Sequence, residues 1–387
     1  MAKKRKTNWV LCLFALFIGA AGGFFGLTYF TLPLTDELAL SEEIYFSNDP
    51  ANGEVVTDVF DADISIHFLE LGNKFSGDCT YIKTKEADIL IDCGSKTNSI
   101  STVSSYLDKY VTDGTLEYVI VTHAHQDHYA GFATSEKVDS IFDLYDCEVI
   151  IDFARTNQKE SAATYSNYKR ELQDEIDAGA LHYTALQCVE ESDGAKSSYE
   201  IGDGITLNIL DSYFYRNNAS TENDYSVCTL ITQTFESGES KNFLFTGDLE
   251  SDGEAELVKL NNLPNVDLFK AGHHGSYTSS TETLLSVIKP KVVCVCCCAG
   301  GSEYTDNSAN QFPSQDFINR IAPYTTAVFV TSLAVDYENN IFTSFNGDIV
   351  CFVKDEELDI RCSNNNTFLK DTDWFKQNRE CPSAWKT

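Results

Sequence analysis

Four side chains of metal-ligand type follow directly on an apolar run. This arrangement constrains the possible fold and function of the chain more than any other feature. The run, residues 118–122, has the composition of a buried strand. The residues that follow it include His123, His125, Asp127 and His128. Such crowded imidazoles and a carboxylate need a cation to compensate them, and this donor set favours zinc over manganese or iron. His123 and His125 can point the same way while the next two ligands turn to a neighbouring position, so the spacing predicts two adjacent ions.

Two later stretches deliver the same kinds of side chain at the ends of expected strands. The apolar run 242–246 leads into Asp248. The run 266–270 leads into the adjacent pair His273 and His274. A glycine-aspartate pair alone is usually a turn. Because three strands all end in ligand-type residues, we expect these ends to meet in space and to form one metal centre.

Short apolar runs alternate with helical patterns between residues 61 and 353. Expected strands lie near residues 64–71, 79–84, 89–92, 118–122, 148–152, 205–210, 225–234, 242–246, 266–270, 291–298 and 327–331. Expected helices lie near residues 100–111, 160–178, 254–260, 282–288 and 314–321. Strands that both alternate with helices and pair through hairpins predict an α/β domain, residues 61–353, of layered sheets covered by helices. Residues 354–387 are more polar and predict a peripheral C-terminal extension.

These motifs resemble those of the metallo-β-lactamase superfamily over about residues 62–353. Within it, the chain is similar to the hydrolase domain of DNA-uptake competence proteins and to the phosphorylcholine esterases of teichoic acids. The segments that carry the resemblance are residues 67–72, 77–78, 89–94, 123–128, 223–227, 246–248 and 273–276. The resemblance implies a four-layer αββα sandwich with the metal ions at one edge, between the sheets.

The resemblance also implies a role for each residue of the motifs. His123 and His125 would bind the first metal ion. Asp127 and His128 would bind the second, and Asp248 would bridge the two. The cofactors would thus be two divalent ions, zinc before manganese or iron. They would lower the pKa of a shared water toward about 7, so that solvent is the nucleophile, and Asp127 would also orient that water.

The adjacent histidines His273 and His274 compete for one ligand position. We assign His274 to the second metal ion. His273 is then left for the substrate, where it would donate a hydrogen bond to the phosphate or to the leaving group. The reverse assignment stays open at this stage.

Two positions depart from the family pattern. Many superfamily members have a further histidine at the first metal, but His182 is the sole histidine between His128 and His273. Its surroundings favour a structural role, so the first site would bind its ion weakly or depend on water and a bridging carboxylate. The competence group also usually has a histidine where this chain has Phe312, which bears on the substrate and the proton donor.

The N-terminus predicts export through a membrane anchor. Residues 9–30 contain no charged side chain and are long enough to cross a hydrocarbon core of about 30 Å as a helix. Four cations in residues 3–6 precede them, and the positive-inside bias keeps that end in the cytoplasm. We therefore expect a cytoplasmic basic segment 1–8, a transmembrane signal anchor 9–30, a linker 31–60 and a catalytic domain outside. The alternative is a cleaved signal peptide and a secreted domain.

The composition is strongly acidic and rich in cysteine. The chain has 28 Lys plus Arg against 59 Asp plus Glu, a net charge of −31, which disfavours a broad surface for nucleic acids. Four of its 13 cysteines lie in residues 292–298, where they read as small apolar residues of a buried strand. Cys362 and Cys381, in the polar tail, are the expected disulfide pair.

The leading hypothesis is a membrane-anchored, exported, binuclear hydrolase of phosphodiesters. Its substrate would be a small molecule or polymer of the cell envelope or beyond it, of the teichoic-acid or choline-phosphate type. The alternatives are a nuclease of the competence type, a carbonyl hydrolase such as a lactamase or lactonase, and a non-catalytic wall-binding module. No Gly-x-Ser-x-Gly elbow is present, and the histidines are already accounted for, so a serine triad does not compete.

Overall fold

The computed structural model describes residues 61–386 apart from residues 136 and 337–338. The expected cytoplasmic segment 1–8, membrane anchor 9–30 and linker 31–60 lie outside the described residues. Within the described part, every helix is too short or too polar to cross a bilayer.

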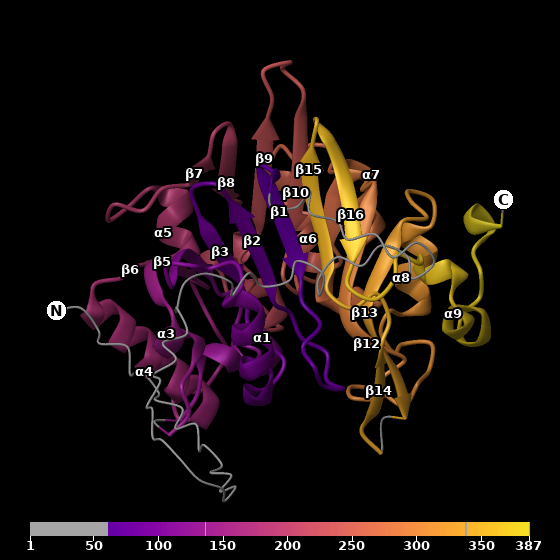
Figure 1. The fold of residues 1–387 in the computed structure, drawn as a ribbon, viewed down its shortest axis with the longest axis horizontal. Helices are drawn as coiled ribbons and strands as arrows, with labels where there is room; N and C mark the ends of the chain where they lie inside the picture. Colours follow the sequence, from indigo (N-terminus) through magenta and orange to yellow (C-terminus); the bar gives the residue numbers. More distant parts are fainter. Residues whose placement is uncertain (1–60, 136, 337–338, 387) are drawn as a thin grey trace, which may run out of the picture. The chain divides into compact units, whose positions relative to one another are not determined.

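Two mixed sheets form the centre of the described part, and each has eight strands there (Figure 1). The first has the order β16 (Glu357–Cys362), β15 (Ile349–Lys354), β1 (Ile64–Phe68), β2 (Thr80–Thr84), β3 (Asp88–Ile91), β4 (Thr115–Ile120), β5 (Asp146–Asp152) and β6 (Leu181–Thr184). The second has the order β14 (Ile341–Ser344), β13 (Val328–Asp336), β12 (Val292–Ala299), β11 (Leu268–Lys270), β10 (Ser240–Phe245), β9 (Thr229–Thr234), β8 (Ile205–Ile209) and β7 (Ser198–Gly202).

Parallel pairs run through one half of each sheet. Strand β4 lies between the parallel strands β3 and β5, and β11 lies between the parallel strands β10 and β12. Parallel strands with helices on one face and a sheet on the other are buried on both sides, so their sequences are continuous apolar runs. Strand β12 shows this, because all of its residues are buried. The interpretation of its cysteines as core residues is confirmed.

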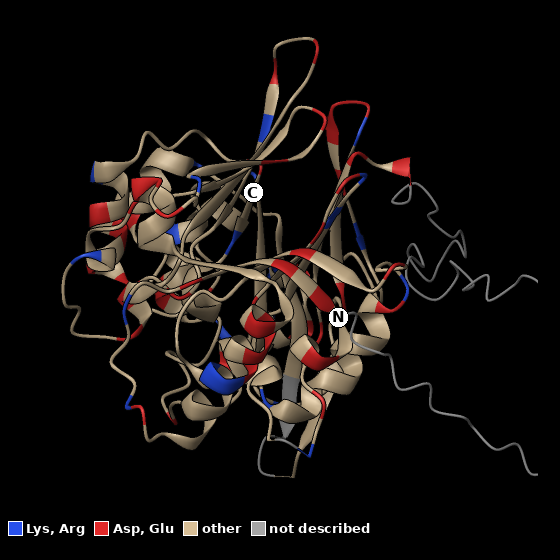
Figure 2. Ribbon diagram, turned by 90° about the vertical axis from the view of Figure 1, so that its left-hand side faces the viewer, with Lys and Arg blue, Asp and Glu red and all other residues tan. Residues whose placement is uncertain are grey.

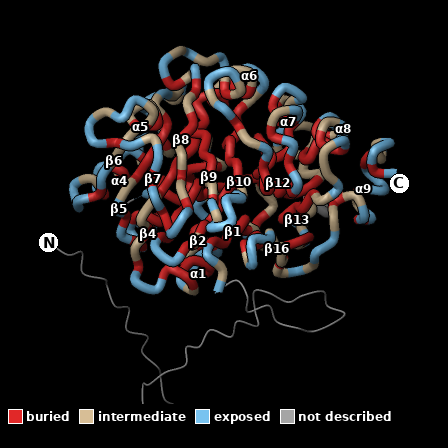
Figure 3. Tube along the Cα trace, turned by 90° about the horizontal axis from the view of Figure 1, so that it is seen from above, coloured by how far each residue is buried: buried red, intermediate tan, exposed pale blue. Residues whose placement is uncertain are grey.

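Helices cover the outer faces of the two sheets. Figure 3 shows α1 (Ile100–Leu107) on one side of the strands, and α6 (Ser251–Leu260), α7 (Glu282–Ile288) and α8 (Gln315–Ile321) on the other. Helices α3 (Ile141–Leu144) and α4 (Ala163–Ala178) contact each other, and α3 also contacts α1, while α5 (Ala185–Glu190) follows β6 directly. Each helix buries one face; α1, for example, buries Ile100, Val103 and Leu107 at helical spacing. The layers are therefore helix, sheet, sheet and helix, as the resemblance implied.

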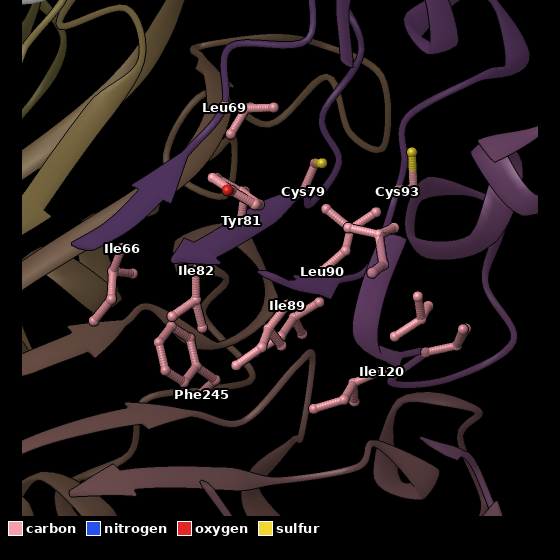
Figure 4. Packing of buried hydrophobic residues seen from close by; sticks show 14 of the residues in the cluster. Ile66, Leu69, Cys79, Tyr81, Ile82, Ile89, Leu90, Cys93, Ile120 and Phe245 are labelled. Atoms are coloured by element: carbon pink, nitrogen blue, oxygen red, sulfur yellow. The ribbon is translucent and has the colours of Figure 1, made fainter. Parts of the chain in front are cut away.

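The main core lies between the sheets. Ile66, Ile82 and Ile89 of the first sheet face Phe245 of the second, as Figure 4 shows, and all four side chains are at most 2% exposed. Full burial of one such side chain contributes roughly 1.5–3 kcal/mol. This core therefore holds the two sheets together, and it fixes how the strand ends of one sheet face those of the other.

Residues beyond 354 are part of the domain, contrary to the expected peripheral extension. Strand β16 pairs with β15 and forms an edge of the first sheet. After it, α9 (Asp373–Asn378) buries Phe375, and Trp385 is 4% exposed and donates from Nε1 to the backbone oxygen of Thr325 at 2.8 Å. The prediction failed because a few well-spaced aromatic residues in a polar segment are enough to dock it.

The expected disulfide between Cys362 and Cys381 is wrong. Both cysteines are free, as are the other cysteines of the described part. Cys362 is buried in the core cluster between the sheets, whereas Cys381 packs at the margin of a second cluster behind the second sheet. The prediction failed because both cysteines lie in polar stretches of sequence, and a local pattern does not show that they pack against different clusters.

Candidate metal centre

Three strand ends converge at one place. The segment after β4 carries His123, His125, Asp127 and His128, and the last two lie in the short helix α2 (Gln126–Tyr129). Strand β10 leads into Asp248, and the parallel strand β11 leads into His273 and His274. Because β4 belongs to the first sheet and the other two strands to the second, both sheets contribute to the cluster.

Four of these residues form a tight group that could hold a metal ion. The members are Asp127, His128, Asp248 and His274, and one ligand atom from each lies within 4.8 Å of the others. Asp248 Oδ2 is 3.0 Å from His128 Nε2 and 3.4 Å from His274 Nε2. Asp127 Oδ2 is 3.5 Å from His274 Nε2. Two imidazole nitrogens and two carboxylates are a donor set that suits zinc.

The first histidine pair lies beside this group. His123 Nε2 and His125 Nδ1 are 3.1 Å apart, and the ring centroids of His123 and His128 are 4.2 Å apart. The other ring nitrogen of His123, Nδ1, lies 3.5 Å from the hydroxyl oxygen of Ser226. The same hydroxyl oxygen accepts a hydrogen bond from the Asp248 amide at 3.1 Å. A serine thus stands next to this pair, and the first position has fewer strong ligands than the second.

His182 takes no part in the cluster. Its Nε2 pairs with Asp152 Oδ1 at 3.0 Å, on the neighbouring strands β6 and β5. This is the structural role that the sequence indicated.

The second His pair divides between the interior and the solvent side. His274 is fully buried, and its Nε2 has no hydrogen-bond partner. Buried polar atoms usually have a partner, so an unpartnered Nε2 fits a role as a metal ligand. The side chain of His273 is 22% exposed, and its Nδ1 contacts Thr278 Oγ1 at 3.0 Å and Glu250 Oε1 at 3.4 Å. Both residues have positive φ, at 47° and 54°, a strained backbone that lets adjacent side chains diverge. The geometry favours His274 as the ligand.

Asp92 and Cys296 orient the two buried imidazoles. Asp92 Oδ2 is 2.7 Å from His128 Nδ1, and Asp92 also accepts from the amide and the hydroxyl of Thr122 at 2.7 Å. The backbone oxygen of Cys296 lies 2.9 Å from His274 Nδ1. When Nδ1 donates to such an acceptor, Nε2 is left free to bind a metal ion. Asp92 lay in a segment that carried the family resemblance, but the sequence did not assign it this role.

Lys270 is a buried cation that sequence reasoning missed. It is 2% exposed, and its Nζ contacts a carboxylate oxygen of Asp78, lies 3.5 Å from Asp248 Oδ1 and donates to the backbone oxygen of Gly247 at 3.1 Å. The available signal was a lysine inside an apolar strand, because lysine is rarely buried without an anionic partner. Lys270 holds two carboxylates of the cluster in place and offsets part of their charge.

The buried acids and imidazoles shift one another's pKa values. Burial disfavours the charged form of His128, but Asp248 and Asp92 outweigh it and raise the pKa of His128 well above its usual value. Burial is likewise overcome at His274, where Asp248 and Asp78 raise the pKa to about 10. At Asp248, burial is overcome by His128 and His274, which lower its pKa. Metal binding at this cluster would therefore release protons.

Comparison with known proteins is consistent with this geometry. Residues 72–137 match the family model described as the metallo-beta-lactamase superfamily. ComE operon protein 3 of Bacillus subtilis (strain 168) is 25% identical over 182 residues, which cover 46% of this chain and 20% of that protein. Recombination protein 2 of Haemophilus influenzae is 25% identical over 272 residues, which cover 69% of this chain and 28% of that protein. The chain thus matches under a third of the length of either relative.

Among solved structures, the metallo-beta-lactamase fold protein YhfI from Bacillus subtilis is 12% identical, with 74% of this chain and 98% of that chain covered and a TM-score of 0.35. The matched family model spans the loop from His123 to His128, and the fold gathers Asp127 and His128 of this loop with Asp248 and His274. Residues 72–137 of the chain are thus similar to the metallo-beta-lactamase superfamily.

Proposed function

We propose that this chain is an exported, metal-dependent hydrolase of phosphodiesters. The observation that carries the proposal is the buried convergence of Asp127, His128, Asp248 and His274, whose ligand atoms lie within 4.8 Å of one another. These residues would hold one divalent ion, and His123 and His125, with Asp248, would hold a second. Bound divalent ions would supply Lewis acidity and make water a nucleophile near neutral pH.

The residues around the centre have separate tasks. Asp92 and the Cys296 carbonyl keep the Nε2 atoms of His128 and His274 directed into the cluster. Lys270 neutralises carboxylate charge from within the protein. His273, whose side chain is 22% exposed, would donate a hydrogen bond to a substrate oxygen.

The charge of the centre favours an anionic substrate. The cluster brings together the carboxylates of Asp78, Asp92, Asp127 and Asp248, against which Lys270 is a single fixed cation. Two divalent ions would more than balance the three remaining negative charges before a water is deprotonated, with the imidazoles neutral. Such a positive centre suits an anionic phosphodiester better than an uncharged lactone.

The rest of the molecule disfavours a long nucleic acid as the substrate. Acidic residues occur on helices and loops over several parts of the surface (Figure 2), in keeping with the net charge of −31. Such a surface repels a polyanion beyond the few phosphates near the centre. A small or choline-substituted phosphodiester of the cell envelope therefore remains the leading candidate, and a nuclease is the second.

A hydrolysis panel with the full-length chain, supplied with zinc or manganese, tests the proposal. The substrates are bis-p-nitrophenyl phosphate, p-nitrophenyl phosphorylcholine, single-stranded DNA and nitrocefin. We expect the chain to hydrolyse the phosphodiesters and leave nitrocefin intact. Asp248→Asn should abolish hydrolysis, whereas Asp252→Asn, an exposed aspartate in the next helix, should leave it unchanged. Activity on nitrocefin alone would overturn the substrate class.

We further propose that residues 9–30 anchor the domain to the outer face of a membrane. The uncharged segment and the preceding cations support this orientation. Protease added to intact cells should degrade the domain, and a tag on the N-terminus should stay protected. Protection of the domain would contradict the proposed topology.

A further inference from the structure

A tyrosine that the sequence did not single out stands on the solvent side of the centre. Tyr304 lies in the loop between β12 and α8, and it is 54% exposed. Its hydroxyl donates to Asp127 Oδ2 at 2.7 Å. Its ring lies 5.5 Å from that of Phe312, which in turn lies 5.7 Å from His273 and 5.6 Å from His274.

The loop that carries Tyr304 is anchored on both sides of this residue. Glu303 accepts from the Ser76 amide at 3.0 Å and pairs with Lys96 Nζ at 3.5 Å. The amide of Gly300 donates to the backbone oxygen of Phe312 at 2.7 Å, which closes the loop at its base. The hydroxyl of Tyr304 is therefore held next to the cluster by contacts outside the cluster.

Few neighbouring groups can donate a hydrogen bond to a leaving oxygen at this position. His273 is already proposed to donate to a substrate oxygen, Phe312 has no donor, and Lys270 is buried against Asp78. Lys96 is directed to Glu303. In an in-line displacement at phosphorus, water attacks on one side and the leaving oxygen departs on the opposite side. Because Asp127, His128, Asp248 and His274 are buried, we expect the departing group to leave toward solvent, and the exposed Tyr304 is on that side.

We propose that Tyr304 is a catalytic residue that donates a hydrogen bond to the leaving oxygen of the phosphodiester; this assignment rests on the proposed function. In the reaction, a water oxygen forms a bond to phosphorus and the ester P–O bond breaks. The leaving oxygen keeps the bonding electron pair and receives a proton that the water gives up, so the products are a phosphomonoester and an alcohol. Tyr304 keeps its own proton throughout, and its hydroxyl rotates from Asp127 to the substrate.

The test compares the wild type with Tyr304→Phe in the zinc-loaded full-length chain. The substrates are methyl aryl phosphates whose leaving groups range from p-nitrophenol to unsubstituted phenol. We expect kcat/KM of the variant to fall about 100-fold for the phenyl ester, because one donor to a developing oxyanion is lost. For the p-nitrophenyl ester, whose leaving oxygen is already stabilised, we expect a fall of less than about threefold. Tyr277→Phe, an exposed tyrosine after His274, is the matched control and should change neither rate.

Zinc affinity, measured by competition with a chromogenic chelator, separates catalysis from support of Asp127. We expect Tyr304→Phe to bind zinc within about twofold of the wild type, since it loses no ligand. An equal loss of rate across all esters, or a tenfold loss of zinc affinity, would overturn the assignment and leave Tyr304 as a support of Asp127. If the wild type hydrolyses none of the esters, the proposed function fails and the assignment falls with it.

Discussion

At the scale of single residues, the centre depends on side chains that orient the candidate ligands. His128 binds Asp92 through Nδ1 and presents Nε2 to Asp248. Of these two partners, only Asp248 is a candidate metal ligand. The contact with Asp92 decides which nitrogen of His128 is free to bind a metal ion and how rigidly the ring is held.

Replacement of Asp92 therefore tests the orientation of His128. We expect Asp92→Asn to weaken zinc binding about 10- to 100-fold, as losses of such supporting carboxylates usually do. Chelator competition measures this. Asp152→Asn is a matched control, because it disrupts a similar Asp–His pair, with His182, outside the cluster. Equal zinc affinity in both variants would show that Asp92 is not needed for orientation.

We expect His67 to make the fold sensitive to acid. Burial, aided by Lys83, lowers the pKa of His67 to about 3, and its ring contacts the hydroxyls of Tyr106 at 2.6 Å and Ser65 at 2.8 Å. Between pH 6.5 and about 3 the unfolded chain binds a proton here that the folded chain does not, so stability falls as the pH falls through this range. From pH 6.5 to 5 the loss from this residue is about 2 kcal/mol.

His67→Gln should remove that part of the pH dependence. Urea unfolding in EDTA at pH 7, 6 and 5 measures the free energy of unfolding of both proteins. We expect a flatter profile for the variant, whatever its stability at pH 7. Parallel profiles would mean that His67 is protonated in the folded protein.

At the scale of elements, the centre depends on close backbone contact between loops. Gly94 follows β3, and a Cβ at this position would overlap with the backbone oxygen of Asp127. The amide of Cys93 donates to the His128 oxygen at 2.7 Å, and the Asp78 amide donates to the Asp127 oxygen at 3.0 Å. Three loops thus meet through their backbones, and a glycine allows the approach.

We expect Gly94→Ala to lower the free energy of unfolding by about 3 kcal/mol and to weaken zinc binding, because the loop of Asp127 and His128 must move. Urea unfolding and chelator competition measure the two effects. Gly179→Ala faces open space at φ +120°, so it should cost about 1 kcal/mol through backbone strain and leave zinc binding unchanged. Unchanged zinc binding in Gly94→Ala would contradict the importance of this loop contact.

Elements differ in how well their sequences predict them. Strand β12 was expected from an unbroken apolar run, and the structure has it as a fully buried strand. Strand β16 and helix α9 were missed, because their segments are mainly polar and only a few residues, such as Cys362 and Phe375, are buried. A segment that docks through isolated contacts has no periodic pattern by which to recognise it.

At the scale of the whole molecule, the centre joins the two sheets. His128 follows a strand of the first sheet, whereas Asp248 and His274 follow strands of the second. Ions bound between them should therefore stabilise the domain as a unit. At free zinc 100 times above the dissociation constant, we expect a gain of about 2.7 kcal/mol, seen as a higher Tm by calorimetry. Asp248→Asn should lose most of this gain. If the Tm of the wild type does not change when zinc is added, a metal site in the folded protein is contradicted.

The sequence by itself determined the types of candidate ligand at the centre and the class of fold. The order of ligand types from His123 to His128 depends on neighbours along the chain, and so do the apolar runs that predict strands. The tertiary structure decided everything that depends on contacts between distant segments. It turned His274 inward and His273 outward, placed Lys270 between Asp78 and Asp248, and kept Cys362 away from Cys381. The physical reason is that burial and partner choice follow from how sheets and loops pack, and a local pattern contains no information on which distant residue fills the space beside it.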